Sequence, residues 1–262
     1  MKQFNTLLIE EQNDNALIIT LNRPEKANAI SPEMMDELLE IISDLRYNSD
    51  IKYVVFKGAG KHFSGGADLS KLVELYDSGN LTPSAARLNQ SKGHEIMNKL
   101  EELEQVTIVA IDGPCIGGGL ALALACDFRI MTEKSTISIP EVERGIFFTW
   151  GSTPRMINIV GVAKAKELIM LCDTINSEEA LGMNLVTKVV PNNALMDEVD
   201  RIISKLDSSP FLPIRMTKKI ANAASIGVMK NVMIYDTELF EQSILSGEPI
   251  EEMKKFVNRK LT

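Results

Sequence analysis

The chain has 262 residues, of which 45% are hydrophobic and 24% are charged, and its formal net charge is -8. This length is ample for a sizeable buried core, and the composition excludes a disordered, collagen-like or low-complexity chain. Proteins that bind nucleic acid usually present a basic surface, so the acidic balance argues against nucleic-acid binding.

The cysteines and the apolar runs bear on the compartment. Cys115, Cys126 and Cys172 lie far apart with no metal-binding spacing, which is typical of a reduced cytosolic interior. The longest apolar run, residues 116–126, is about half of the ~20 residues that a membrane-spanning helix needs. The first eleven residues lack the apolar core of a secretory signal. We therefore expect a cytoplasmic protein with no membrane segment.

Strands and helices alternate along the first two thirds of the chain. An apolar run over 17–21 ends at an Asn-Arg-Pro turn, and Ser31 followed by Pro32 is typical of a helix start. The predicted strands are 17–21, 53–56, 106–111, 128–131, 136–139 and 186–190, and the predicted helices are 32–45, 69–75, 84–104, 120–126, 163–170 and 177–181. This alternation predicts an α/β fold with mostly parallel strands.

The end of the chain has a different pattern. From residue 194 onward it is helical, with interruptions at residues 208–210 and at Gly247. We place a boundary near residue 200, so that residues 1–200 form the core and residues 201–262 form a C-terminal helical region.

Several common kinds of site are not indicated. The only two histidines, His62 and His94, have no metal-ligand spacing and are not near a GxSxG motif, which argues against a zinc site or a Ser-His-Asp hydrolase. The segment from Gly58 begins like a dinucleotide-binding fingerprint, but Phe63 stands where the third glycine belongs, and the Walker A spacing is absent.

Two glycine-rich loops, residues 64–68 and 112–119, each lie between a predicted strand and a predicted helix. Backbone N–H groups at such positions can form an oxyanion hole, although the same loops can also serve only as tight turns. Glu141 follows a short apolar strand. A carboxylate next to apolar residues is a candidate general base because desolvation raises its pKa, but a lone glutamate is more often simply solvated.

Short motifs that follow one another along the whole chain add to the evidence from the two loops and Glu141. They are residues 22–29, 63–69, 110–119, 126–129, 140–142, 153–156, 163–165, 180–186 and 256–259. Taken together and in this order, these motifs resemble those of the enoyl-CoA hydratase/isomerase (crotonase) superfamily. The resemblance implies a spiral core of β-β-α turns and a C-terminal helical region that drives formation of a trimer or of a dimer of trimers. It also implies an acyl-CoA thioester as the substrate.

The resemblance also implies roles for individual residues. The oxyanion hole falls on the backbone N–H groups of Ala67 and Gly118, and the acid–base residue on Glu141. Gly65 matches the position whose carbonyl holds the adenine of CoA. Four further residues are implied or plausible contacts of CoA. Phe256 and Arg259 match positions that reach the CoA of a neighbouring subunit, where the family commonly has lysine in place of Arg259, and Lys61 and Lys71 are plausible phosphate contacts that could equally be solvated.

One departure from the family pattern bears on the reaction. Hydratases of this family typically use two glutamates, and the first of them falls on Ala121, while the second is retained as Glu141. Hydration requires two proton transfers at once, whereas one carboxylate can move a proton from the α-carbon to the γ-carbon. The pattern therefore favours an isomerase with a single glutamate. Glu143 lies close by in sequence, and Arg144 could pair with it.

A second departure follows Glu141. Many relatives carry a glycine-rich run there, but this chain has Phe147, Phe148 and Trp150. We expect these aromatic residues to line or back the acyl pocket, although an ordinary place in the core is an alternative.

The resulting prediction is an acyl-CoA enzyme that stabilises a thioester enolate and most simply isomerises an enoyl-CoA double bond. The alternatives are an enoyl-CoA hydratase, another enolate reaction such as decarboxylation or thioester hydrolysis, and a non-catalytic binding protein. No metal or nicotinamide cofactor is expected, because coenzyme A is part of the substrate and the chemistry is proton transfer.

Overall fold

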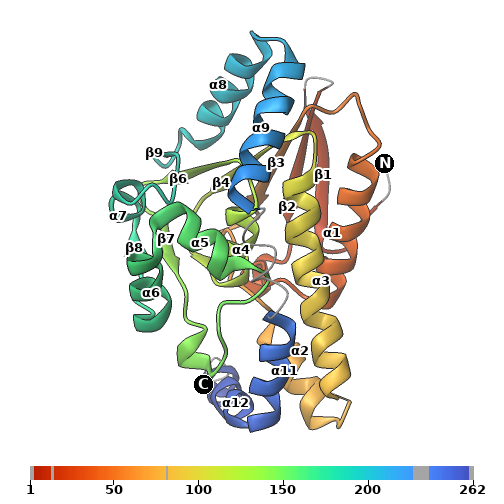
Figure 1. Cartoon of the computed structure of the whole chain (residues 1–262), viewed down its shortest axis with the longest axis vertical. Helices are drawn as coiled ribbons and strands as arrows, with labels where there is room; N and C mark the ends of the chain where they lie inside the picture. Colours follow the sequence, from red (N-terminus) through yellow and green to blue (C-terminus); the bar gives the residue numbers. More distant parts are fainter. Residues whose placement is uncertain (1–2, 13–14, 81, 227–235, 260–262) are drawn as a thin grey trace.

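The computed structural model describes residues 3–12, 15–80, 82–226 and 236–259. Its strands are β1 (Leu7–Gln12), β2 (Ala16–Leu21), β3 (Tyr53–Gly58), β4 (Val106–Ile111), β5 (Cys115–Ile116), β6 (Phe128–Thr132), β7 (Thr136–Ser138), β8 (Ile175–Asn176) and β9 (Lys188–Val190). Its helices are η1 (Pro24–Lys26), α1 (Pro32–Leu45), α2 (Leu69–Asp77), α3 (Pro83–Glu102), α4 (Gly118–Leu124), η2 (Val142–Arg144), α5 (Ser152–Val160), α6 (Val162–Leu171), α7 (Ser177–Gly182), α8 (Leu195–Asp207), α9 (Phe211–Ile226), α11 (Asp236–Ser246) and α12 (Glu248–Arg259). Figure 1 shows their arrangement.

The strands form two sheets. The larger has the order β1-β2-β3-β4-β6-β9, and the smaller has the order β5-β7-β8. Within the larger sheet only the β1–β2 pair is antiparallel. The prediction of an α/β fold with mostly parallel strands is confirmed. Strand β1 was not predicted, because at the edge of the sheet its charged residues Glu10 and Glu11 interrupt the apolar pattern.

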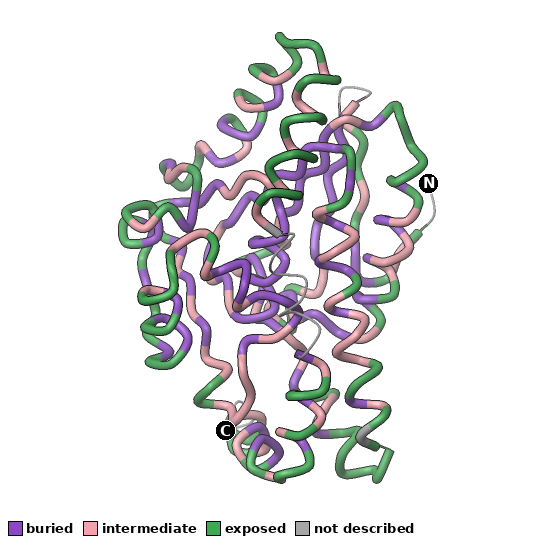
Figure 2. Tube along the Cα trace, viewed as in Figure 1, coloured by how far each residue is buried: buried purple, intermediate pink, exposed green. Residues whose placement is uncertain are grey.

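Both faces of the larger sheet are covered, which explains why its central strands are apolar throughout. Successive side chains of a strand point to opposite faces. Ile19 and Phe56 accordingly belong to the core cluster on the side of α1, α3 and α4, whereas Ile18 and Val55 belong to the cluster covered by α8 and α9. Figure 2 shows the buried residues concentrated in and around the sheet.

Helix α8 belongs with the sheet rather than with the last helices. Its residues Leu195, Val199 and Ile203 pack in the same cluster as β3, β4 and β6. The boundary predicted near residue 200 falls inside this helix. Beyond α8, the described elements are all helices.

Helices α11 and α12 pack against α2 and α3 at the other end of the molecule from α8 (Figure 1). Phe240 and Met253 form a third cluster there with Leu69 and Ala86. These contacts join the end of the chain to the helix that follows the first glycine-rich loop.

Helix α5 was not predicted, because Gly151 and Pro154 interrupt the helical pattern of the sequence. A proline in the first turn removes no intrahelical hydrogen bond, however, so the helix forms. Over the residues that the structure describes, none of the helices combines the length and the apolar character needed to cross a membrane.

Candidate active site

The two glycine-rich loops lie side by side. The Ile116 N–H donates a hydrogen bond of 2.9 Å to the carbonyl of Ser64. The Ser64 hydroxyl accepts from the Gly66 N–H at 3.2 Å and donates to the carbonyl of Asn28 at 2.9 Å. Ser64 is fully buried, so these bonds fix the two loops relative to each other.

This packing brings together the backbone nitrogens of Ala67 and Gly118. A Cβ built on Gly118 would lie 3.1 Å from the Ala67 nitrogen. Gly118 is the first residue of α4, where an N–H has no acceptor within the helix. Neither N–H donates to another atom of the described residues. Two free donors at one point are suited to holding a negatively charged oxygen.

Glu141 lies against Gly117, the residue that precedes Gly118. A Cβ on Gly117 would overlap Glu141 Oε1, so any larger residue there would displace the carboxylate. The strand that leads to Glu141 is tied to the same loop, because the Gly117 N–H donates to the carbonyl of Ser138 at 3.0 Å.

The surroundings of Glu141 favour its protonated form. Its Oε2 is buried and has no hydrogen-bond partner among the described residues. Burial raises the pKa of Glu141 to about 7, although its own backbone N–H and Arg144 oppose the shift. A carboxyl group with a pKa close to neutrality both accepts and returns protons efficiently.

Glu141, Ala67 and Gly118 line a cavity with an empty volume of about 730 Å³ that includes its open mouth. Its apolar lining consists of Ile30, Pro32, Met35, Ala67, Leu69, Leu72, Leu75, Ala86, Ala121, Ile146, Phe148, Trp150 and Phe240. Among polar side chains in the lining, Thr149 donates to Gln90 at 3.0 Å. An apolar cavity with few polar groups is typical of a small-molecule site.

The three aromatic residues singled out in the sequence are not equivalent. Phe148 and Trp150 are buried and line the cavity. Phe147 is half-buried and is not part of that lining; it packs instead against the third cluster, which α2, α3, α11 and α12 form. Ala121, where the resemblance would place a first glutamate, is buried in the cavity wall.

A smaller cavity adjoins the larger one. It has an empty volume of about 280 Å³ and is lined by Gly65 as well as by Ala67 and Glu141. Arg144 forms part of its wall, and its guanidinium lies 3.4 Å from the ring centre of Phe256. Phe256 therefore contacts Arg144 of its own chain, and the predicted contact with a neighbouring subunit stays a prediction.

The three basic residues proposed for CoA lie at the surface. Lys71 is exposed at the edge of the larger cavity and is paired with Glu74 at 2.7 Å. Lys61 is exposed on the loop after β3 and lines neither cavity. Arg259 is exposed at the end of α12.

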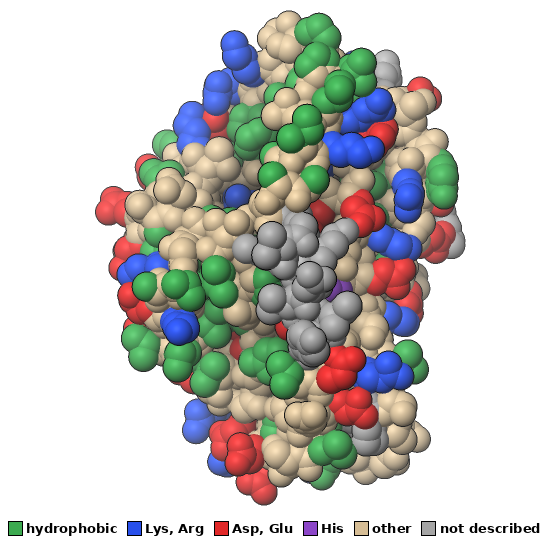
Figure 3. Space-filling model, viewed as in Figure 1, with side chains coloured by type: hydrophobic (Ala, Val, Ile, Leu, Met, Phe, Trp, Pro, Cys, Tyr) green, Lys and Arg blue, Asp and Glu red, His purple; other side chains and the backbone are tan. Residues whose placement is uncertain are grey.

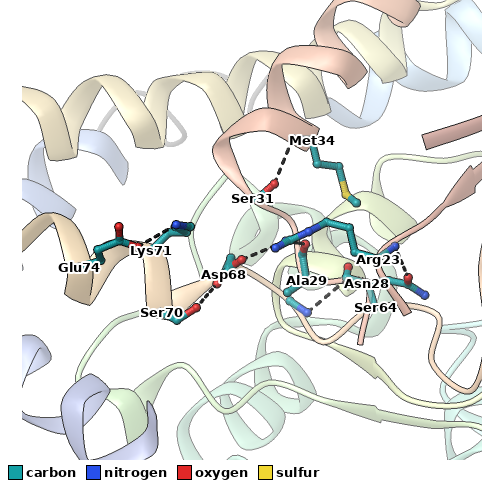
Figure 4. Close-up of polar contacts among 11 residues, drawn as sticks. Arg23, Asn28, Ala29, Ser31, Met34, Ser64, Asp68, Ser70, Lys71 and Glu74 are labelled. Carbon is teal, nitrogen blue, oxygen red and sulfur yellow. Dashed lines mark hydrogen bonds and ion pairs between the residues drawn. The ribbon is translucent and has the colours of Figure 1, made fainter. Parts of the chain in front are cut away.

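The sequence assigned no role to Arg23 and Asp68, although both belong to its motifs. Arg23 Nη1 lies 2.9 Å from Asp68 Oδ2, and Ser70 binds the same carboxylate (Figure 4). Burial opposes ionisation of Asp68, but the hydrogen bonds from Ser70 and Arg23 lower its pKa. Arg23 Nη1 also donates to the Ala29 carbonyl at 2.6 Å. This ion pair therefore fixes the segment that follows Ala67.

Comparison with known proteins agrees with this geometry. The family model described as enoyl-CoA hydratase/isomerase matches residues 11–261. The chain belongs to this family. It is 29% identical to the short-chain-enoyl-CoA hydratase of Clostridium acetobutylicum over 98% of this chain and 97% of the relative. It is also 29% identical to the crotonyl-CoA hydratase of Syntrophomonas wolfei, over 97% and 95%.

The fold is that of the crotonase superfamily. The crystal structure of enoyl-CoA hydratase from Bacillus halodurans superimposes with a TM-score of 0.88 at 24% identity, and the match covers 96% of this chain and all of that one. The expected α/β core with C-terminal helices is thereby confirmed.

Gly118→Ala should disturb the site, whereas Gly182→Ala should not. A Cβ on Gly118 would lie 2.7 Å from Trp150 Cζ3, but one on Gly182 would have nothing within 4 Å. We expect the first change to lower the free energy of unfolding by about 1–3 kcal/mol and the second to change it by less than about 0.5 kcal/mol. Urea titration measures both. Equal effects of the two changes would contradict the close packing at Gly118.

Glu141→Gln should alter how stability depends on pH. With a pKa of about 7 instead of 4.5, folded Glu141 keeps a proton that the unfolded chain has lost between these pH values, so wild-type stability falls as pH rises through this range. Gln lacks this penalty. The variant should therefore gain stability relative to wild type, by on the order of 2–3 kcal/mol at pH 8 compared with pH 4.5. Asp236, whose pKa burial raises to about 6, contributes equally to both proteins. Parallel stability curves would refute the raised pKa.

Proposed function

We propose that this enzyme moves the double bond of an enoyl-CoA thioester between the 3- and 2-positions through an enolate. Glu141 carries the proposal: it is a carboxylate with a pKa of about 7 and a buried, unpartnered oxygen beside the N–H groups of Ala67 and Gly118. The other carboxylate in the described lining of the cavity, Asp68, is held in its ion pair with Arg23. Ala121 supplies no second acid or base.

The proposed reaction needs one proton carrier. The thioester oxygen accepts hydrogen bonds from Ala67 and Gly118, each contributing roughly 2.7–4 kcal/mol to transition-state stabilisation. Glu141 removes a proton from C2 of the 3-enoyl-CoA, and the electron pair is delocalised onto the thioester oxygen. When the carbonyl re-forms, the double bond lies between C2 and C3, and C4 takes the proton from Glu141. The proton lost at C2 is thus the one gained at C4.

The remaining substrate contacts belong to the same proposal. The carbonyl of Gly65 would hold the adenine of CoA, and its place in the smaller cavity beside Glu141 supports this role. Lys61 and Lys71 would meet the phosphates, and Phe256 and Arg259 would contact CoA from α12. Because proton transfer changes no oxidation state, we propose that the reaction needs no nicotinamide. Because the N–H groups of Ala67 and Gly118 would stabilise the enolate oxygen, we propose that it needs no metal either.

Hydration of a 2-enoyl-CoA is the second candidate, and the hydratase names of the relatives favour it. In that reaction Glu141 alone, or another group, would have to activate water. Changing Ala121 to Glu would then raise hydration by supplying the second carboxylate.

An ultraviolet assay of the conjugated thioester separates the two reactions. With 3-enoyl-CoA substrates of several chain lengths we expect absorbance to increase, because isomerisation creates the conjugated product. Glu141→Gln should lower kcat by about 10²–10⁴-fold while CoA thioesters still bind, since the proton carrier is lost but the cavity is not.

Glu143→Gln is the matched control, because this exposed glutamate lies two residues away. It should leave turnover unchanged. Loss of absorbance from 2-enoyl-CoA, without any gain from 3-enoyl-CoA, would replace the isomerase with a hydratase. Full turnover by Glu141→Gln would remove Glu141 from its role.

We also propose a homotrimer or a dimer of trimers. Helix α9 carries Leu212, Met216 and Ile220 at four-residue intervals, and they are 54%, 53% and 67% exposed. Figure 3 shows hydrophobic side chains along this helix. Residues at this spacing share one helix face, and such an apolar face is typical of a subunit interface.

Ile220→Glu should therefore lower the molar mass measured by light scattering to that of a smaller assembly, because a charge would be buried in the interface. Tyr47→Glu is the control, since Tyr47 is 86% exposed on a different part of the surface. A wild-type monomer would contradict the proposal.

A further inference from the structure

Trp150 is held in a backbone conformation that tryptophan rarely adopts. Its φ is 58°, and φ of the following Gly151 is 69°. For a residue with a bulky side chain this left-handed conformation costs free energy, so it persists only where surrounding contacts enforce it. The position of this side chain therefore depends on other residues.

The indole ring fills the space between α4 and α3. A Cβ on Gly118 would lie 2.7 Å from Cζ3 and 3.0 Å from Cη2, and a Cβ on Gly93 would overlap the pyrrole edge of the ring. Trp150 is 4% exposed. Its Nε1 is buried and finds no hydrogen-bond partner among the described residues, so no bond to the ring itself fixes its place.

Two charged side chains hold the backbone of Trp150 instead. Arg155 Nη1 donates to the Trp150 carbonyl at 3.0 Å, and Asp236 Oδ2 accepts from the Gly151 N–H at 2.8 Å. Arg155 is itself fixed by Glu101, with bonds of 2.9 and 2.6 Å from its Nε and Nη2. Since Arg155 and Asp236 are both buried, these bonds are shielded from water.

Asp236 comes from the first turn of α11, far along the chain from Trp150. The same helix places Phe240 in the lining of the larger cavity. Helix α11 thus contributes Phe240 to the cavity lining directly, and it fixes Trp150 in that lining through the hydrogen bond from Gly151.

We propose that Trp150 determines substrate specificity by limiting the acyl pocket to short acyl groups, and that Asp236 and Arg155 are positioning residues that hold it in place. The ring touches Gly118, whose N–H would bind the thioester oxygen, so it borders the first carbons of the acyl chain. The proposal rests on the proposed function, because it assumes an acyl-CoA in this cavity.

Binding of saturated acyl-CoAs tests whether Trp150 limits the length of the acyl group, and it does not require turnover. Isothermal titration calorimetry would compare butyryl-CoA with decanoyl-CoA in wild type, Trp150→Ala and Trp150→Phe. We expect wild type to prefer butyryl-CoA and Trp150→Ala to shift the ratio of the two Kd values toward decanoyl-CoA by at least about tenfold, with Trp150→Phe between them. An unchanged ratio in both variants would overturn the role of Trp150. Absence of acyl-CoA binding by wild type would instead refute the proposed function.

Fluorescence tests the positioning residues, because Trp150 is the only tryptophan of the chain. Asp236→Ala removes the acceptor for the Gly151 N–H, so the emission should shift to longer wavelength and acrylamide should quench it more strongly. Asp236→Asn keeps an acceptor oxygen and should restore most of the wild-type signal. Glu238→Ala, an exposed change on the same helix, should have no effect.

The chain-length ratio completes this test. Asp236→Ala should shift it in the same direction as Trp150→Ala, whereas Asp236→Asn should not. If Asp236→Ala left both the emission and the chain-length ratio unchanged, Asp236 would not be a positioning residue.

Discussion

The site depends on one contact, in which Ser64 joins the two glycine-rich loops. Its carbonyl binds the Ile116 N–H, and its hydroxyl joins the Gly66 N–H to the carbonyl of Asn28. A Cβ on Gly119 would come within 2.6 Å of Ser64 Cβ, so the close approach requires glycine. If this contact opened, the N–H groups on the two loops would no longer face the same point, and no side chain of the site could replace them.

Two carboxylates of the same cavity have opposite properties because their surroundings differ. The side chain of Asp68 is buried, but Arg23 and Ser70 bind its carboxylate and lower its pKa. The carboxylate therefore stays ionised and fixes the loop. Oε2 of Glu141 is buried without such a donor, so desolvation outweighs its own backbone N–H and Arg144, and its pKa rises. Burial alone does not make a catalytic acid. Among the described residues, Glu141 has no side-chain donor like those of Asp68, and this distinguishes the two carboxylates chemically.

The sequence was sufficient for most of the strands and helices and for the two glycine-rich loops, because these depend on local patterns of apolar residues and glycine. Only the resemblance to the family, and no local pattern, associated Glu141 with these loops. The sequence was not sufficient where distant segments meet. Nothing local indicates that Phe147 turns toward α11 and α12 while its neighbour Phe148 lines the cavity. No local pattern shows that Asp236 binds the backbone of Gly151, 85 residues away. Such contacts follow from tertiary packing, which has no short sequence signature.

These distant contacts divide the site into two parts. The groups suited to enolate chemistry lie on two adjacent loops and one strand end, which the sheet holds directly. The walls of the cavity come from several parts of the chain, with Met35 on α1 and Leu72 on α2, but also Trp150 after η2 and Phe240 on α11. Phe240 belongs to neither glycine-rich loop, so a substitution there changes the space in the cavity without removing a hydrogen bond that joins the two loops. A fold arranged in this way can retain one proton-transfer chemistry while its substrates differ.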